Sequence, residues 1–219
     1  MAKLSKVQSK EITLAAGKFH LQGSLSIPQD ATSLVLFAHG SGSSRHSPRN
    51  QAVAKVFNEG KLATLLMDLL TNEEEQIDMQ TRHLRFDIFL LAQRLIEATN
   101  FLQQNEETKN LHIGYFGSST GAAAALVAAA QKGAAIGAVV SRGGRPDLAA
   151  SSLPKVISPT LLIVGGNDFE VLRLNQQALE LLNAEKKLDI VPHATHLFEE
   201  PGALEEVARL ANWWFTHYL

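Results

Sequence analysis

The sequence has no cysteine among its 219 residues. This absence excludes disulfide bonds, a cysteine nucleophile and thiolate metal ligands. A large excess of charge is also missing, because the formal net charge at pH 7 is only -2. So small a net charge provides no general attraction to nucleic acid or to an anionic membrane surface. We therefore expect a small-molecule substrate, and neither nucleic acid nor a membrane as a partner.

Long apolar runs are lacking as well. The first 14 residues, MAKLSKVQSKEITL, do not contain the continuous apolar core of a signal peptide. No segment approaches the length of about 20 apolar residues that a membrane-spanning helix needs. Repeats and low-complexity linkers are absent too. We therefore expect a cytoplasmic protein that forms a single domain over residues 1–219, a length sufficient for one full core.

Strand-like and helix-like segments alternate along the sequence. Six short segments are rich in apolar or β-branched residues: 34–38, 63–67, 111–116, 136–140, 160–164 and 188–191. Apolar residues recur at helical spacing over three longer stretches: Leu84 to Leu102, Val171 to Leu181 and Leu204 to Trp214. This alternation predicts an α/β fold with a mostly parallel central sheet and helices on both faces. Residues 10–27 predict an antiparallel hairpin at one edge, with its turn near Ala16-Gly17.

The pentapeptide GSSTG, residues 117–121, stands between a strand-like run and an alanine-rich, helix-like run. Small residues two before and two after Ser119 permit the sharp turn of a nucleophile elbow. Such a turn raises the Ser119 hydroxyl clear of the sheet and places the Thr120 amide beside it, as half of an oxyanion hole. Ser118 is expected to be structural.

A base and an acid for this serine follow later strands. Asp168 follows the segment 160–164, and His196 follows the segment 188–191. The order Ser119, Asp168, His196 is that of α/β-hydrolases, and ends of parallel strands meet at one sheet edge. The sequence therefore predicts a catalytic triad.

Other residues compete for these roles. His193 lies closer to its strand and is expected to brace the loop. Asp189 lies within a strand pattern, and Asp147 follows a shorter turn. An Asx-turn alone would account for Asp168, although not for the histidine at the matching place after the next strand.

The second half of the oxyanion hole is expected in the loop HGSGSS, residues 39–44. Its glycines permit close approach, and the Ser41 amide is the expected partner of the Thr120 amide. His39 is expected to orient this loop through hydrogen bonds and not to act as the base. The chemistry requires neither a metal nor an organic cofactor.

Four motifs together resemble the dienelactone-hydrolase-like branch of the α/β-hydrolase superfamily: HGSGSSRHSPRN, GSSTG, GGNDFEV and HATHLFEEPG. The resemblance extends over nearly the whole chain. It implies an α/β-hydrolase fold without a large lid and hydrolysis of a small carboxylic ester or thioester. Enzymes acting on dienelactone use an elbow cysteine, where this chain has Ser119, and a substrate-binding arginine shortly after the histidine. Here residues 197–200 are LFEE, which argues against dienelactone itself.

Several basic residues follow two of the predicted strands: Arg45, His46 and Arg49 after the first, Arg142 and Arg145 after the fourth. Because guanidinium groups bind carboxylates and phosphates bidentately, we expect Arg45, Arg142 and Arg145 to contact an anionic part of the substrate. The alternative is that these arginines are solvated or pair with Asp147 and with the acidic run 73–75, itself expected to be a solvated loop.

Three other functions remain open. Gly40-Ser41-Gly42 and Asp68 fit part of a dinucleotide-binding fingerprint, but Arg45 replaces its third glycine and the serine, histidine and aspartate stay unexplained. A non-catalytic α/β-hydrolase scaffold would bind a ligand only. An acyltransferase would use the same triad with an acceptor other than water.

Overall fold

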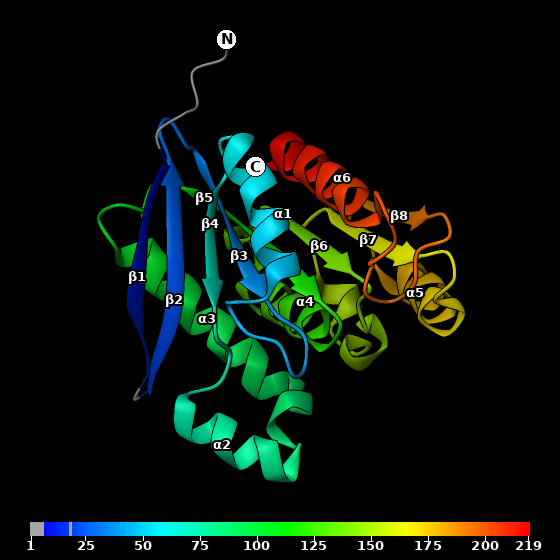
Figure 1. Ribbon diagram of the computed structural model, residues 1–219, viewed down its shortest axis with the longest axis horizontal. Helices are drawn as coiled ribbons and strands as arrows, with labels where there is room; N and C mark the ends of the chain where they lie inside the picture. The colour runs from blue at the N-terminus through cyan, green and yellow to red at the C-terminus, as the bar shows by residue number, and fades with distance from the viewer. Residues whose placement is uncertain (1–6, 18) are drawn as a thin grey trace.

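One eight-stranded sheet organises the part of the chain that the computed structural model describes, residues 7–17 and 19–219 (Figure 1). The strand order is β1-β2-β4-β3-β5-β6-β7-β8. The strands are β1 (Val7–Ala16), β2 (Phe19–Pro28), β3 (Ser33–Ala38), β4 (Ala63–Met67), β5 (His112–Ser118), β6 (Ala138–Arg142), β7 (Thr160–Gly165) and β8 (Lys186–Val191). The first two form an antiparallel hairpin and the other six are parallel, which confirms the predicted sheet.

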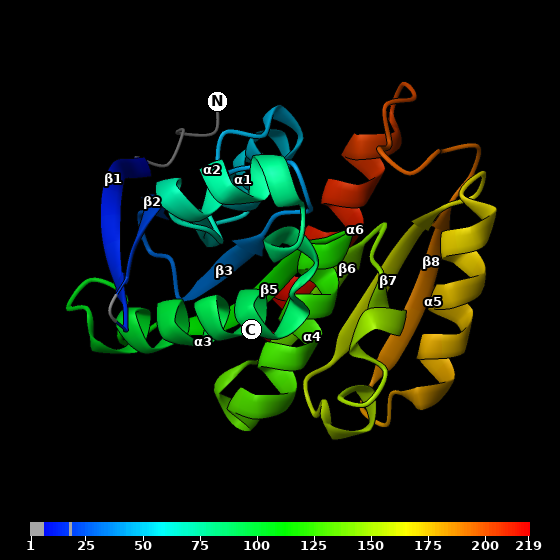
Figure 2. The same ribbon diagram turned by 90° about the horizontal axis from the view of Figure 1, so that it is seen from below.

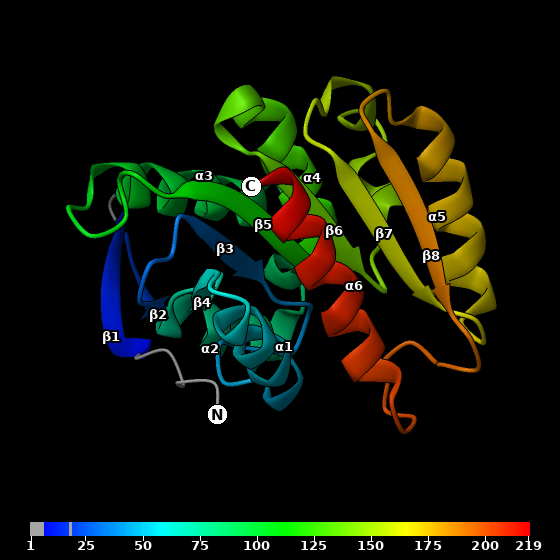
Figure 3. The ribbon, with the colours of Figure 1, turned by 90° about the horizontal axis from the view of Figure 1, so that it is seen from above.

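Helices cover both faces of this sheet (Figures 2 and 3). One face carries α1 (Pro48–Glu59) and α6 (Ala203–Tyr218); the other carries α3 (Ile88–Gln104), α4 (Thr120–Lys132) and α5 (Phe169–Leu181). A further helix, α2 (Asn72–Thr81), follows the end of β4 and projects beyond the sheet (Figure 1). The arrangement places the ends of the parallel strands, and the loops that follow them, at one edge.

Successive side chains along each strand point to opposite faces of the sheet, so the apolar residues form two cores. On β3, Leu36 belongs to the core under α3 and α4, whereas its neighbour Phe37 belongs to the core under α1 and α6. The second core contains an aromatic cluster, in which the Phe37 ring centroid lies 4.9 Å from that of Phe116 and 5.6 Å from that of Phe57. Burial of each such ring contributes about 2–3 kcal/mol to folding. Trp214 is buried in this core and Trp213 is exposed at its edge.

Two local predictions were wrong. Leu84 does not belong to the long helix, because Asp87 caps that helix by accepting a hydrogen bond from the Leu90 amide at 3.0 Å, and Leu84 lies in a preceding 3-10 turn. The acidic run 73–75 is not a loop but the first turn of α2, where a capping box joins Thr71 and Glu74. Acidic residues suit this position because the amino end of a helix carries a partial positive charge. Neither α1 nor α2 was among the predicted helices.

The junction of β5 and α4 is unusually close-packed. Residues Thr120 to Ala129 of α4 are mostly alanine, and all of them are buried. At Gly121 a Cβ atom would lie 2.2 Å from the carbonyl oxygen of Ala38 and 2.4 Å from that of His39. Only glycine fits there, so the backbone of α4 is pressed directly against the end of β3. This contact fixes the position of the backbone two residues earlier, at Ser119.

Candidate active site

Ser119 is the single residue between the end of β5 and the start of α4. Its backbone has φ 51° and ψ -122°, a conformation that a residue with a side chain adopts only under strain. Strain of this kind is typical of a nucleophile elbow. The Ser119 side chain is partly exposed, whereas Ser118 is buried at the end of its strand.

The structure brings Asp168 and His196 together. Nδ1 of His196 lies 2.7 Å from Oδ2 of Asp168, a hydrogen bond that fixes the orientation of the imidazole ring. The two loops that carry them are tied, because the Asn167 side chain donates to the carbonyl oxygen of His193 at 2.9 Å. His193 thus braces the loop through its backbone.

The loop after β8 has a second anchor that the sequence did not reveal. Thr195 donates to Oε1 of Glu200 from its amide at 3.0 Å and from its hydroxyl at 2.6 Å. The hydrogen bond from the Thr195 hydroxyl lowers the pKa of Glu200. The loop that carries His196 is therefore closed on itself by an ionised carboxylate.

Ser119 and His196 line the same cavity, of about 260 Å³, which we call the catalytic pocket. Its wall is also formed by Gly40, Ser41, Ser43, Ser47, Arg49, Ser118, Arg142, Gly143 and Leu197. Ser119 and His196 therefore meet at this pocket from the loops after β5 and β8, and Asp168, from the loop after β7, lies behind His196 as its hydrogen-bond partner.

The predicted oxyanion-hole residues also meet, although not amide beside amide. The Ser41 amide donates to the side-chain oxygen of Thr120 at 3.0 Å. Thr120 is the first residue of α4, so its own amide has no acceptor within the helix and points toward the positive end of the helix dipole. A substrate oxygen would have to share the Ser41 amide with the Thr120 hydroxyl, or displace that hydroxyl from the amide.

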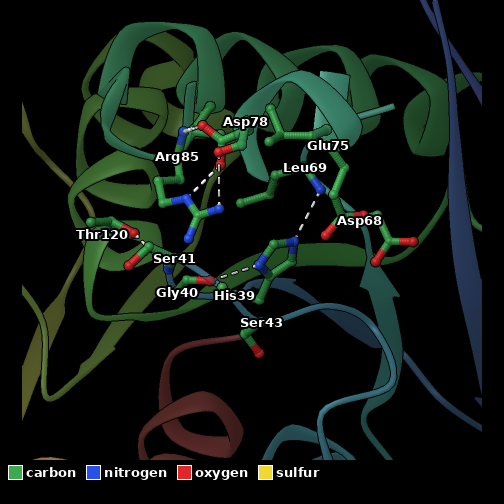
Figure 4. Close-up of a pocket in the computed structure, with 13 residues that line it drawn as sticks. His39, Gly40, Ser41, Ser43, Asp68, Leu69, Glu75, Asp78, Arg85 and Thr120 are labelled. Carbon is green, nitrogen blue, oxygen red and sulfur yellow. Dashed lines mark hydrogen bonds and ion pairs between the residues drawn. The ribbon is translucent and has the colours of Figure 1, made fainter. Parts of the chain in front are cut away.

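His39 fixes the loop that contains Ser41 (Figure 4). Its Nε2 accepts a hydrogen bond from the Leu69 amide at 3.1 Å, and its Nδ1 lies 2.9 Å from the carbonyl oxygen of Gly40. Because Nε2 is an acceptor, Nδ1 carries the proton and the ring is neutral. Burial lowers the pKa of His39, which favours this neutral form. The geometry is that of an orienting residue, as the sequence predicted.

Figure 4 also shows a small cavity, of about 30 Å³, which we call the α2 cavity. It shares Gly40, Ser41 and Ser43 with the catalytic pocket. The buried acid in its lining, Asp78, is paired. Asp78 accepts hydrogen bonds from the Leu84 amide at 2.8 Å and from Nε of Arg85 at 2.5 Å. Burial opposes ionisation of Asp78, but the hydrogen bonds and charge of Arg85 outweigh it and lower the pKa of this carboxyl.

The three predicted substrate-binding arginines have different surroundings. Arg45 pairs with Asp68 through both its amide and its guanidinium, and Arg145 forms a bidentate pair with Asp147 at 2.7 and 2.8 Å. Neither of them lines the catalytic pocket. Arg142 does line it, and only 8% of its surface is exposed. The prediction for Arg45 and Arg145 therefore lacks the geometric support that Arg142 has.

Arg142 is also the one of the three without a compensating charge among the described residues. Its Nη1 atom is buried without a hydrogen-bond partner in that part of the chain. Burial, together with the nearby charge of Arg49, lowers the pKa of Arg142 to about 10. The guanidinium is consequently still protonated at neutral pH.

A search of residues 7–17 and 19–219 for metal ligands finds no group of three histidine, aspartate or glutamate side chains suited to a metal ion. Within the same ranges no helix combines the length and apolar character needed to cross a membrane.

Comparison with known proteins places the chain in a family. Residues 24–216 match the sequence model of the Dienelactone hydrolase family. A dienelactone hydrolase from Anabaena variabilis is 60% identical, with a TM-score of 0.96 over 97% of this chain and 99% of its own. Est1E from Butyrivibrio proteoclasticus shares the fold at 15% identity, with a TM-score of 0.80 over 95% of this chain and 98% of its own.

A protein of Mycobacterium tuberculosis that is named as a phosphoribosyl transferase is 54% identical over 213 residues, or 97% of this chain. The chain spans only 47% of the length of that relative. The match to the family sequence model, by contrast, covers most of the chain. It includes the elbow at Ser119 and the loops after β3 and β8 that line the catalytic pocket. The chain belongs to the dienelactone hydrolase family of α/β-hydrolases and has the hydrolase fold of that family.

Proposed function

We propose that the protein is a serine hydrolase that cleaves small carboxylic esters or thioesters through an acyl-enzyme. One observation carries this proposal: a strained serine in an elbow shares a pocket with a histidine that is bonded to an aspartate. In this proposal Ser119 is the nucleophile, His196 the general base and Asp168 the residue that holds the histidine tautomer. Membership of the family and its esterase neighbours support the reaction class.

The first half of the reaction forms the acyl-enzyme. The Ser119 oxygen attacks the carbonyl carbon while Nε2 of His196 accepts the hydroxyl proton. Negative charge that develops on the carbonyl oxygen is stabilised by the Thr120 amide and by the Ser41 amide, once the Thr120 hydroxyl shares or releases the latter. The protonated histidine then donates its proton to the leaving alcohol or thiol as the carbon–oxygen or carbon–sulfur bond breaks.

The second half releases the acid. Water loses a proton to His196 and attacks the acyl carbon, and the same proton returns to Ser119 as the ester bond to the enzyme breaks. Some 39% of the His196 side chain is exposed, so water can reach the base. The same opening admits an alcohol or amine acceptor, so the exposure is compatible with both hydrolysis and acyl transfer. Product analysis with and without candidate alcohol or amine acceptors distinguishes the two outcomes.

The phosphoribosyl transferase name of the mycobacterial relative belongs to a protein about twice as long as this chain. In this chain the pocket is lined by a serine and by a histidine that is hydrogen-bonded to an aspartate, and these groups suit acyl transfer. We therefore propose ester or thioester hydrolysis, and not phosphoribosyl transfer, for these residues.

Covalent labelling by a serine-directed fluorophosphonate tests the nucleophile, alongside hydrolysis of 4-nitrophenyl esters of increasing chain length. Ser119→Ala should abolish labelling and lower turnover by up to about a millionfold, because triad members act as a unit. Ser118→Ala is the matched control and should still be labelled. Labelling that persists in Ser119→Ala and disappears in Ser118→Ala would place the nucleophile one residue earlier.

A further inference from the structure

Two arginines of the described chain are buried, and they differ in what surrounds them. Arg94 on α3 is 2% exposed and lies 2.6 Å from a carboxylate oxygen of Glu74 and 3.7 Å from one of Glu97. Arg142, at the end of β6, is 8% exposed and takes part in none of the ion pairs found among the described residues. Burying a charge without a partner is costly, so Arg142 needs a counter-ion from outside the chain.

The position of Arg142 ties it to the nucleophile. Arg142 lies opposite Ser118 in the register of β5 and β6, and the Ser119 amide points to the Arg142 carbonyl oxygen at 3.4 Å. Gly143, the next residue, packs against the carbonyl oxygen of His196. The guanidinium lines the catalytic pocket together with Ser119 and His196. An anion bound to Arg142 would therefore lie in the same 260 Å³ as the reacting ester.

Another part of the pocket wall is the start of α1, which brings a second guanidinium to the pocket. Ser47, the N-cap of α1, and Arg49 in its first turn both line the pocket, and that turn has no acidic residue. Glu199 binds Nη1 of Arg49 at 3.0 Å from an exposed position, but Nε of Arg49 is buried without a partner in the described chain. The amino end of a helix adds a partial positive charge that favours anions.

We propose that the catalytic pocket binds an anionic oxygen group of the substrate, a carboxylate or a phosphoryl group, between Arg142, Arg49 and the first turn of α1. The inference rests on the proposed function, since it describes the substrate of that site as an anionic ester. It replaces the broader expectation from the sequence, because Arg45 and Arg145 already have carboxylate partners and Arg142 has none in the part of the chain that the structure describes.

A matched substrate pair tests the inference: 4-nitrophenyl hemisuccinate and its neutral methyl ester, with 4-nitrophenyl 3-phosphonopropanoate as the phosphoryl arm. The wild-type enzyme should have a higher kcat/KM for at least one anionic ester than for the neutral one. Arg142→Gln should lower the anionic-to-neutral ratio about tenfold or more, the effect of losing a charged hydrogen-bonding group. High salt should lower the wild-type ratio only slightly, because a buried contact is weakly screened.

Two further variants keep the test informative if Arg142→Gln folds poorly. Arg49→Gln, at a less buried position, should lower the ratio about threefold to tenfold. Arg145→Gln is the control, because this guanidinium is bonded to Asp147 and lies outside the pocket wall, and its ratio should equal that of the wild type. Neutral esters preferred by the wild type, with the ratio unchanged in Arg49→Gln and Arg142→Gln, would overturn the inference.

Calorimetric titration of Ser119→Ala with succinate and with inorganic phosphate separates this inference from the proposed function. Binding that is lost in the Ser119→Ala, Arg142→Gln double variant supports the anion site even if the wild type hydrolyses no ester. Absence of Arg142-dependent binding, in a wild-type enzyme that hydrolyses neutral esters efficiently, overturns the anion site and leaves the hydrolase proposal intact. The tighter of the two anions shows whether the group is a carboxylate or a phosphoryl group.

Discussion

The loop that contains Gly40, Ser41 and Ser43 lines two cavities. They differ in whether the buried charged side chain in the wall has a partner of opposite charge. In the α2 cavity the acid Asp78 is matched by Arg85, and His39 is neutral. In the catalytic pocket the charge of Arg142 has no partner among the described residues. A paired buried charge supports the scaffold, whereas an unpaired one lowers stability and is available to a ligand. We therefore expect the α2 cavity to contribute to stability and the catalytic pocket to bind a ligand.

Beside the loss of Ser119 itself, the largest effect is expected at the acid of the proposed triad, which holds the histidine of the catalytic pocket. Asp168→Asn should lower turnover on the order of ten-thousandfold, because an amide favours the wrong tautomer of His196. The hydrogen bond of 2.7 Å can still form, so the melting temperature should change little. Steady-state kinetics and thermal unfolding measure the two quantities. Near-normal turnover in His196→Ala, with an inactive His193→Ala enzyme, would transfer the base to the other histidine.

At the α2 cavity, loss of the cation should lower the stability of the protein and leave its substrate selectivity unchanged. Arg85→Gln leaves the carboxylate of Asp78, whose side chain is 3% exposed, without its guanidinium. We expect the free energy of unfolding to fall by about 2–3 kcal/mol, less than for a fully buried pair because Arg85 is partly exposed. Urea denaturation measures this change. The double variant Asp78→Asn, Arg85→Gln should recover part of it.

Arg142→Gln completes that comparison in the same assay. Since it removes a buried charge that has no partner in the described chain, the free energy of unfolding should stay the same or rise. Equal destabilisation by Arg85→Gln and Arg142→Gln would show that the two cavities do not differ in this respect.

The smallest expected effect is the pH response of His39. Burial lowers the pKa of His39 in the folded protein below its ordinary value of 6.5, so the unfolded chain binds a proton more readily. The free energy of unfolding should therefore fall as the pH falls below 6.5, until the pH reaches the lower folded pKa. Urea denaturation at pH 7.5 and 5.5 measures the fall. His39→Gln, which can still accept from the Leu69 amide, should show a smaller fall, and an unchanged one would contradict this role.

The sequence revealed the parts of the site that depend on local order. The elbow around Ser119 is specified by its own neighbours, and Asp168 and His196 were found because each follows a strand. Strand ends in a parallel sheet meet at one edge, so order along the chain predicts proximity in space. The hydrogen bond between His196 and Asp168 agrees with that prediction.

The sequence did not predict which distant side chains would pair with one another. Arg45, Arg142 and Arg145 follow strands in the same way, yet Arg45 meets Asp68 from the neighbouring strand and Arg142 meets no acid in the described chain. Such differences depend on which way each side chain leaves its loop. The Ser41 amide likewise contacts the Thr120 hydroxyl only because the folded loop lies against α4. Helix α2 was missed because it has little apolar periodicity and depends on its cap.

The contact of Gly121 with Ala38 has a consequence for engineering. The position of the proposed nucleophile depends on a contact between two backbone segments, which lie too close together for a side chain at residue 121 to fit. Saturation of position 121 in a directed-evolution library should therefore return glycine almost alone. Leu197 differs from Gly121 in both respects, because it lines the catalytic pocket and its side chain is exposed. Substitutions that change substrate scope are therefore expected to be tolerated at position 197 and not at position 121.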